Sequence, residues 1–538
     1  MITRLAFTLL CSVAPAAIFA QQVDLRSPDE FISVEGEIVG FNGVMLRVQT
    51  NVGAISVPAS EVICYGTGCL QTVQNNDFGL TADAFVDLVT VSAEEAASAA
   101  EAAAAATATS ETLTVGIDGA AYEGLYRTLA GAYAVASDAS NQIDFAPNAD
   151  LTLTGPDQNE TTLLFDADAG SDADVVVGPA TLGGTLDRAY AGPADWASAT
   201  QLSHHLIALD AFAVIVAPNA DISAISVSDL ARVFAGEVTN WSQIGGADVS
   251  VLPLQLPTDT VLNQEFVRLV MEPAGRAVAG NVLTIGTAEG VTASINQFPG
   301  SISVVDLADA DPALTVDVAG ACGIPVPPTM FHAKSGDYPL IRPIMAQFAA
   351  PRGTNLVTEL FDFASRDVAQ SLVAREGYVD YSASLQDAVA KNARLSSLLE
   401  ADLDEAQRAS AAQMFQVLFD ADRTSLSLTG GAASGPEGGW NRAMFVDLLE
   451  LMEDPGNAGR EIVFVGFGES TAGSAAAIDA STTAAAEMVA AVQAVAADVV
   501  SANNLTLSSF GFGNVAPTTC YDGQVAGSEY TRIEVWIR

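Results

Sequence analysis

The feature that most constrains the fold is the alternation of short apolar strands with amphipathic helices that begins at Leu113. A buried strand is predicted at 112–116, with further strands at 174–177 and 212–216. Between the first two strands, apolar residues recur on one helical stripe: Tyr122, Leu125, Tyr126, Leu129 and Tyr133. A second helix is expected from Ser226, whose side chain would cap it. This alternation predicts an α/β domain with mostly parallel sheets, which binds ligands beyond the carboxyl ends of its strands.

Two breaks in composition divide the chain into domains. Residues 93–112 consist almost entirely of Ala, Glu, Ser and Thr, and predict a linker that is either a solvated helix or a flexible spacer. Residues 384–410 are polar and helix-prone, and predict a second, helical linker. The α/β domain is therefore expected to occupy residues 113–383.

The two flanking parts have patterns of their own. Residues 21–92 contain short alternating segments separated by turn sequences at 42–43 and 51–53, which predict a small β domain. Residues 411–538 mix strands and helices, and predict an α+β domain. Its expected elements are strands at 415–419, 462–465, 505–507 and 533–537, a helix at 440–452 and a later Ala-rich helix.

Residues 1–20 predict a signal peptide. Arg4 supplies the basic start, residues 5–18 are apolar, and Ala20 is the small residue expected before the cleavage site. The mature protein is therefore expected in the periplasm or cell envelope. An association with the outer membrane or cell wall is left open.

Export makes disulfides permissible. Cys64 and Cys69 enclose a tight loop with two glycines, which favours a local disulfide. Zinc is the alternative for this spacing, but the chain has 3 His residues and no second Cys pair nearby, so neither a metal nor a cofactor is predicted. The pairing of Cys322 and Cys520 is left open.

Charge and motifs exclude several classes of function. The chain has 65 acidic and 21 basic residues, a net charge of -44, and no basic stripe, which argues against nucleic acid as a partner. His204 and His205 precede Asp210, but the sequence has no nucleophile elbow, Walker loop or dinucleotide fingerprint. The chain is therefore predicted not to be an enzyme.

Three motifs resemble those of phosphate-type periplasmic solute-binding proteins. They are the segment 230–246 around Trp241, the strand 338–343 that begins Tyr-Pro-Leu, and the helix and turn at 369–379. The resemblance covers residues 113–383 and implies two α/β lobes that close over a ligand by hinge motion. It also implies a small anion such as phosphate as the ligand, and an ABC permease as a partner.

The resemblance implies a ligand site built from three loops. The first contributes Asp118, Gly119 and Ala120, the second Ser171 and Asp172, and the third Gln255, Thr258, Asp259 and Thr260. Gln255 stands at or beside a position where the family usually has Arg, and Asp118 and Ala120 replace the usual hydroxyl residues. Because a buried anion normally pairs with a cation, these departures predict weakened phosphate binding.

Residues 411–538 resemble an OmpA-like domain, a type that commonly binds peptidoglycan. The resemblance rests on the strand and acidic loop at 462–469, and on closing segments at 511–517 and 532–535. It implies Glu469 and Arg532 as peptidoglycan contacts. The helix around 478–486 lacks the Arg that the family usually carries there.

The predicted function is a periplasmic substrate-binding protein of an anion transporter, attached to the envelope through an OmpA-like domain. The alternative is an envelope structural or interaction protein without transport activity, whose ligand and peptidoglycan sites have degenerated.

Overall fold

The computed structural model describes the larger part of the chain. The described residues are 22–26, 33–41, 45–50, 53–58, 63–65, 110–117, 120–136, 140–143, 151–154, 160–165, 175–180, 202–321, 323–349, 360–361, 363–429, 439–518 and 532–538. The chain divides into two compact units, Met1–Thr107 and Ala108–Arg538. The predicted signal peptide, Cys69, Cys322 and Cys520 lie outside the described residues.

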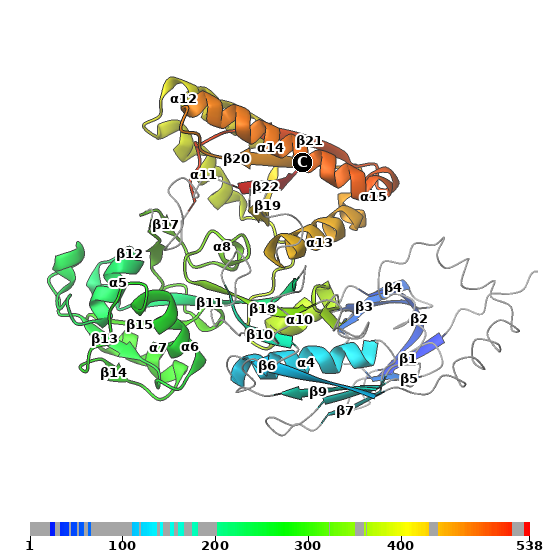
Figure 1. Ribbon diagram of the computed structural model, residues 1–538, viewed down its shortest axis with the longest axis horizontal. Helices are drawn as coiled ribbons and strands as arrows, with labels where there is room; N and C mark the ends of the chain where they lie inside the picture. Colours follow the sequence, from blue (N-terminus) through cyan, green and yellow to red (C-terminus); the bar gives the residue numbers. More distant parts are fainter. Residues whose placement is uncertain are drawn as a thin grey trace, which may run out of the picture. The chain divides into compact units, whose positions relative to one another are not determined.

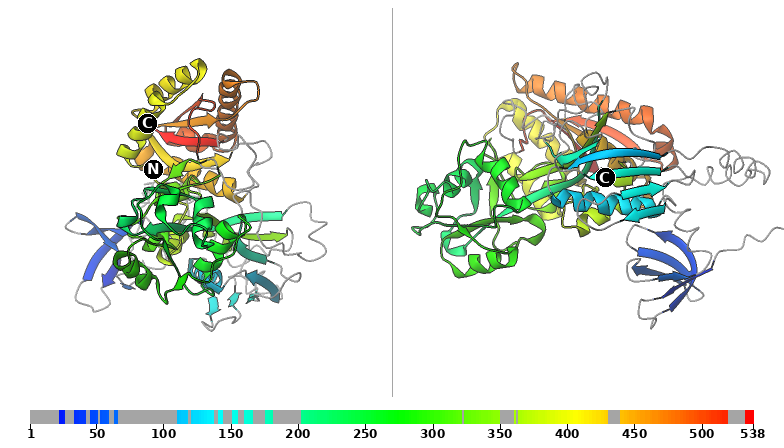
Figure 2. Two further views of the ribbon diagram at one scale, coloured as in Figure 1. Left: turned by 90° about the vertical axis from the view of Figure 1, so that its left-hand side faces the viewer. Right: turned by 60° about the horizontal axis from the view of Figure 1, so that its bottom comes forward.

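The first unit contains a five-stranded antiparallel sheet in the order β4-β3-β2-β1-β5, shown in blue in Figure 2. Its strands are β1 (Gln22–Arg26), β2 (Ser33–Phe41), β3 (Met45–Thr50), β4 (Gly53–Pro58) and β5 (Ile63–Tyr65). The two predicted hairpins are confirmed, because β2 pairs with β3 and β3 pairs with β4. Cys64 lies in β5, where it pairs with Leu25, and its disulfide with Cys69 stays a prediction.

The second unit is built on a curved ten-stranded mixed sheet, in the order β14-β13-β15-β11-β18-β10-β6-β9-β8-β7 (Figure 1). Two long antiparallel strands, β11 (Leu202–Val216) and β18 (Ile341–Ala349), lie at its middle, with Asp210 opposite Arg342. β11 pairs first with β18 and then, from Phe212 to Val216, with β15. The sheet therefore passes from one half of the domain to the other along β11.

The half of the sheet beyond β18, with its helices, is called the first lobe. Its strands are β6 (Ser110–Ile117), β7 (Ser140–Ile143), β8 (Leu151–Thr154), β9 (Glu160–Phe165) and β10 (Val175–Pro179), and its helices are α4 (Ala120–Ala136) and α10 (Asp367–Arg375). β6 runs parallel to β9 and β10, but β10 is antiparallel to β18 and β8 is antiparallel to β9, so the sheet is mixed and the prediction of a mostly parallel sheet is wrong. The predicted stripe from Tyr122 to Tyr133 is confirmed as the buried face of α4.

The other half, beyond β11, is called the second lobe. Its strands are β12 (Ala224–Ser226), β13 (Leu252–Gln255), β14 (Leu283–Thr284), β15 (Ser301–Asp306), β16 (Asp317–Ala319) and β17 (Pro325–Val326). Its helices are α5 (Val227–Phe234), α6 (Val261–Phe266) with a π-helical continuation at Val267–Met271, α7 (Ala288–Gln297) and α8 (Met330–Lys334). The predicted cap of α5 is confirmed, since the Ser226 hydroxyl accepts a hydrogen bond from the Asp229 amide at 2.9 Å.

Residues 384–538 form the C-terminal region, whose four-stranded sheet has the order β19-β22-β20-β21. Its elements are α11 (Ala388–Glu400), α12 (Glu405–Leu418), β19 (Asp422–Thr429), α13 (Gly439–Glu453), β20 (Glu461–Phe467), α14 (Ser474–Val495), α15 (Ala497–Ala502), β21 (Thr506–Gly511) and β22 (Arg532–Ile537). The predicted helix at 440–452 and the strands at 462–465 and 533–537 are confirmed.

Two expectations for this region are corrected. The strand predicted at 415–419 belongs to the helix α12, because Ala411, Met414 and Leu418 recur at helical spacing and are buried together. The segment 384–410, predicted as a linker, contains α11 and the start of α12. Its Leu395 and Leu398 pack into one core with β20 and β22, so this segment is part of the packed C-terminal region.

The helix α14 is long and apolar enough, by length and composition, to cross a membrane. Here it lies directly on β20 and β21, in orange at the top of Figure 1. Glycines make this close approach possible: a Cβ atom at Gly466 would lie 2.2 Å from the Ser481 carbonyl oxygen, and one at Gly511 would lie 2.1 Å from the Thr482 nitrogen. The helix therefore serves as a packing layer of the C-terminal sheet.

Candidate functional site

The third predicted loop connects a strand to a helix in the second lobe. β13 ends at Gln255 and runs parallel to β14, so the carboxyl ends of both strands meet at one edge of the sheet. The Thr260 hydroxyl donates to the Pro257 carbonyl at 2.8 Å and accepts from the Asn263 amide at 3.3 Å, which caps the start of α6. The loop is thus held in a fixed conformation by its own polar groups.

A cavity of about 860 Å³ opens beside this loop. It is lined by both predicted residues Gln255 and Thr258, and by residues of α6, of its π-helical continuation and of the segment 276–284. The buried Asn263 amide organises the wall by donating to the Leu256 carbonyl at 3.0 Å and to the Gln255 side chain at 3.3 Å. The structure therefore brings Gln255 and Thr258 together at a cavity, whereas Asp259 does not line it; Thr258 and Asp259 are both exposed.

Two arginines meet one buried carboxylate next to this cavity. Glu265 on α6 is 2% exposed, and its two oxygens accept from different guanidinium groups. Arg268, which also lines the cavity, donates to Oε1 at 3.0 Å, and Arg342 on β18 donates to Oε2 at 3.0 Å. The two guanidinium groups therefore meet at one buried carboxylate beside the cavity.

The first lobe contributes to the same region through Tyr122, whose hydroxyl donates to Asp210 at 3.2 Å. Burial raises the pKa of Asp210 well above its usual value, and the nearby charges of Asp306 and Glu265 raise it further. Burial together with Asp309 raises the pKa of Asp306 to about 6.

The other predicted ligand residues come from the first and second predicted loops. Asp118, Gly119, Ser171 and Asp172 lie outside the described residues, and Ala120 is the first residue of α4. The structure therefore does not test these contacts.

Sequence reasoning missed the cations of the site. The sequence predicted a ligand loop without an arginine, whereas Arg268 lines the cavity and Arg342 lies beside it through Glu265. Two signals were available: Glu265 and Arg268 are three positions apart on a helix, and Arg342 belongs to the motif at 338–343. The motif was interpreted only as architecture.

The two predicted peptidoglycan contacts have different environments. Glu469 is exposed in the loop after β20. Arg532 is 5% exposed, donates to the Ala516 carbonyl at 2.6 Å and pairs with Glu534 at 2.8 Å, and its guanidinium lies 4.0 Å from the Phe467 ring centroid. Arg532 thus lies within the interior of the C-terminal region on β22, an inner strand of its sheet.

Parts of the chain are similar to known proteins. Residues 102–365 match the PBP superfamily domain. A curated relative, the phosphate-binding protein PstS of Bacillus subtilis, is 28% identical over 183 residues, which make up 34% of this chain and 58% of the relative. The chain therefore spans less than two thirds of the length of this curated relative.

Two solved structures are similar to part of this chain at low sequence identity. An ABC-type phosphate transport receptor from Vibrio cholerae is 15% identical with a TM-score of 0.37, and the match covers 50% of this chain and 99% of the receptor. PstS from Borrelia burgdorferi is 15% identical with a TM-score of 0.38, and the match covers 50% of this chain and 98% of that protein.

The sequence match makes the central part of the chain, which contains the curved mixed sheet, similar to the binding-protein domains of the PBP superfamily. Part of the chain is also similar in sequence to the phosphate-binding protein PstS.

Proposed function

We propose that this chain is a solute-binding protein that captures phosphate, or a closely related small oxyanion, between its two lobes. It would act in the periplasm and deliver the anion to an ABC permease. The observation that carries the proposal is the pair of guanidinium groups, Arg268 and Arg342, that converge on Glu265, with Arg268 lining the cavity beside the loop 255–260. The similarity to PstS supports phosphate as the anion.

The arrangement suits an oxyanion on physical grounds. Guanidinium groups bind the oxygens of phosphate through charge-assisted hydrogen bonds, which are roughly twice as strong as neutral ones. Thr258 and Gln255 add neutral donors from the loop at the carboxyl end of β13. Glu265 offsets part of the positive charge, which favours reversible binding of the anion.

Calorimetric titration of the full chain with phosphate, and with sulfate in parallel, tests this function. Saturable heat with phosphate is the expected result. A folded protein that gives no heat with either anion would instead favour the alternative, an envelope structural or interaction protein with a degenerate site.

Replacing Glu265 with glutamine is expected to strengthen phosphate binding by about 10-fold, because a neutral amide leaves both guanidinium groups without their carboxylate. The measurement is the dissociation constant of Glu265→Gln by calorimetry. Glu289→Gln, which changes an exposed acid on α7, is the matched control and should bind like the wild type. Unchanged binding by a folded Glu265→Gln protein would show that the charge of Glu265 does not act on the anion, whereas weaker binding would show that Glu265 acts mainly by positioning Arg342.

We propose in addition that the C-terminal region is an OmpA-like domain that attaches the protein to peptidoglycan. The motifs at 462–469 and 532–535 and the exposed position of Glu469 support this assignment. Co-sedimentation of the full chain with purified peptidoglycan tests it, and a protein that stays in the supernatant at every pH tried would argue against attachment.

A further inference from the structure

The apolar interior of the second lobe continues into the C-terminal region. One cluster of buried side chains includes Phe212 and Val214 of β11 and Val304 of β15, and also Phe464 of β20 and Val535 of β22. The first lobe has a separate core, formed by α4, β6, β10 and the residues around Phe361. The C-terminal sheet has a further cluster around Met414 and Trp536, but its residues Phe464 and Val535 belong to the cluster of the second lobe. The cores of the two lobes meet at β11 and β18, which contribute residues to both.

Two helices complete the junction between the second lobe and the C-terminal region. α13 packs against both β11 and β19, and α8 packs against the same two strands. Backbone hydrogen bonds add to this packing: the Ser425 amide donates to the Ser384 carbonyl at 2.7 Å, and the Gln386 amide donates to the Arg423 carbonyl at 2.8 Å. The chain therefore enters the C-terminal sheet without a free linker.

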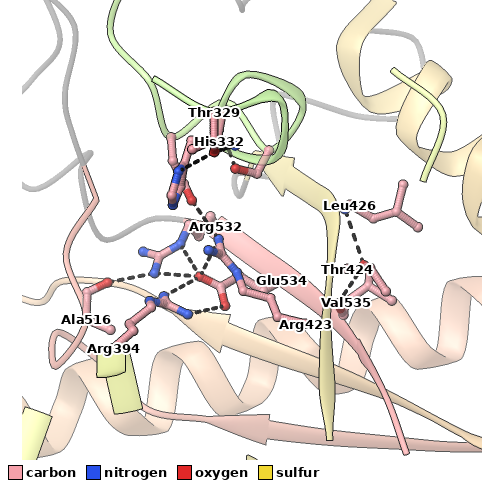
Figure 3. A network of polar contacts seen from close by, with 12 residues as sticks. Thr329, His332, Arg394, Arg423, Thr424, Leu426, Ala516, Arg532, Glu534 and Val535 are labelled. Atoms are coloured by element: carbon pink, nitrogen blue, oxygen red, sulfur yellow. Dashed lines mark hydrogen bonds and ion pairs between the residues drawn. The ribbon is translucent and has the colours of Figure 1, made fainter. Parts of the chain in front are cut away.

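A buried ion pair crosses the same junction (Figure 3). Arg423 on β19 is 1% exposed and donates to Asp337, which follows α8, at 2.9 Å. The same guanidinium lies 3.1 Å from Glu534 on β22 and 5.2 Å from the ring centroid of Phe331 on α8. Breaking such a pair would leave an uncompensated charge in the interior, so the pair resists separation of the two parts.

The contact of the C-terminal region with the first lobe has a different character. There α13 meets the start of α10 with acidic groups, and Glu450 hydrogen-bonds Asp367. Burial and the charge of Asp367 raise the pKa of Glu450 to about 8, so this contact holds a shared proton. Asp447, also on α13, is 2% exposed, and both of its carboxylate oxygens lack a hydrogen-bond partner. Like-charged groups provide a weaker attachment than the apolar core and the Arg423 pair.

We propose that the second lobe and the C-terminal region form one cooperative body, against which the first lobe opens as a separate unit. The C-terminal region is then a structural extension of one lobe, and does not behave as an independent domain on a tether. This inference does not depend on the identity of the ligand.

Native-state hydrogen exchange of the full chain in rising denaturant tests the proposal. Amides of β13, β15, β20 and β22 are expected to exchange through one common opening, with the same dependence on denaturant. Amides of α4 and β6 are expected to open at a different denaturant concentration. The proposal is overturned if β20 and β22 open separately from β15, or if all of these elements open together.

A substitution at the junction sharpens the test. Arg423→Gln should uncouple the body, so that β20 and β22 exchange about 100-fold faster while β15 changes less. Arg460→Gln is the matched control. Arg460 pairs at 3.3 Å, on a partly exposed surface, with Asp422, which lies on β19 like Arg423. Equal acceleration of exchange in β15 and in β20 and β22 of Arg423→Gln would still support one body. Unchanged exchange rates would show that the ion pair does not join the second lobe to the C-terminal region. If Arg423→Gln does not fold, the exchange pattern of the wild type decides the question.

Discussion

Replacing Glu534 with glutamine is expected to lower the free energy of unfolding by about 3–5 kcal/mol. Glu534 is 0% exposed and lies among three guanidinium groups (Figure 3): Arg394 at 2.7 Å, Arg532 at 2.8 Å and Arg423 at 3.1 Å. The indole of Trp536 also donates to it, at 3.0 Å. A neutral amide would leave three buried cations with too little negative charge.

The pH dependence of stability gives a second measure of this substitution. Burial raises the pKa of Glu534, but the three arginines outweigh burial and hold the pKa well below its usual value. A carboxyl with a lowered pKa in the folded state stabilises the fold above its unfolded pKa of about 4.5, and this contribution is lost as the pH falls further. The Glu534→Gln protein should therefore lose less stability than the wild type when the pH is lowered below about 4.5.

Chemical denaturation at neutral and acidic pH measures both effects. Glu461→Gln is the matched control, because Glu461 pairs with Arg538 at 2.6 Å on a partly exposed surface, and it should cost less than about 1 kcal/mol. A cost for Glu534→Gln as small as that of the control would show that the buried cluster contributes little to stability.

Replacing Arg342 with glutamine is expected to weaken phosphate binding by about 10- to 100-fold. A charge-assisted hydrogen bond contributes about 1.5–3 kcal/mol, and a neutral amide cannot replace the charge. Arg342 is 7% exposed and is held by Glu265, so its guanidinium is positioned before an anion arrives. The measurement is the dissociation constant by calorimetry, at fixed salt concentration because salt screens charge.

The control for this experiment is Arg232→Gln. Arg232 lies on α5 in the same lobe and pairs with Asp229 at 2.6 Å on the surface, so its loss changes the total charge by the same amount without touching the cavity. Equal loss of affinity in both variants would mean that net charge, and not the position of Arg342, governs binding. A folded Arg342→Gln protein with wild-type affinity would rule out the proposed contact.

Much of the fold could be predicted from local patterns. The stripe on α4, the Ser226 cap and the strands β20 and β22 depend on residues close together in the sequence, so periodicity and capping chemistry are enough to find them. The segment 415–419 was misassigned because its short apolar run fits a strand as well as a helix. The longer spacing from Ala411 to Leu418 would have resolved it.

The polar clusters could not be predicted in the same way. Glu265 and Arg342 are 77 positions apart, and Arg423 and Asp337 are 86 positions apart, so only the folded chain brings each pair together. The absence of an arginine from the loop 255–260 suggested a site without a cation. In the structure a cation reaches that site from the π-helical segment after α6, and another lies on a crossing strand.

The shared core has a practical consequence for dividing this protein into fragments. A fragment that stops near residue 383 would remove α13 from β11 and leave the apolar residues of that strand facing water. Exposed apolar strands favour aggregation, so the poor behaviour of such a fragment would say nothing about its affinity for a ligand. Cutting after residue 107 follows the boundary between the two compact units and leaves this core whole.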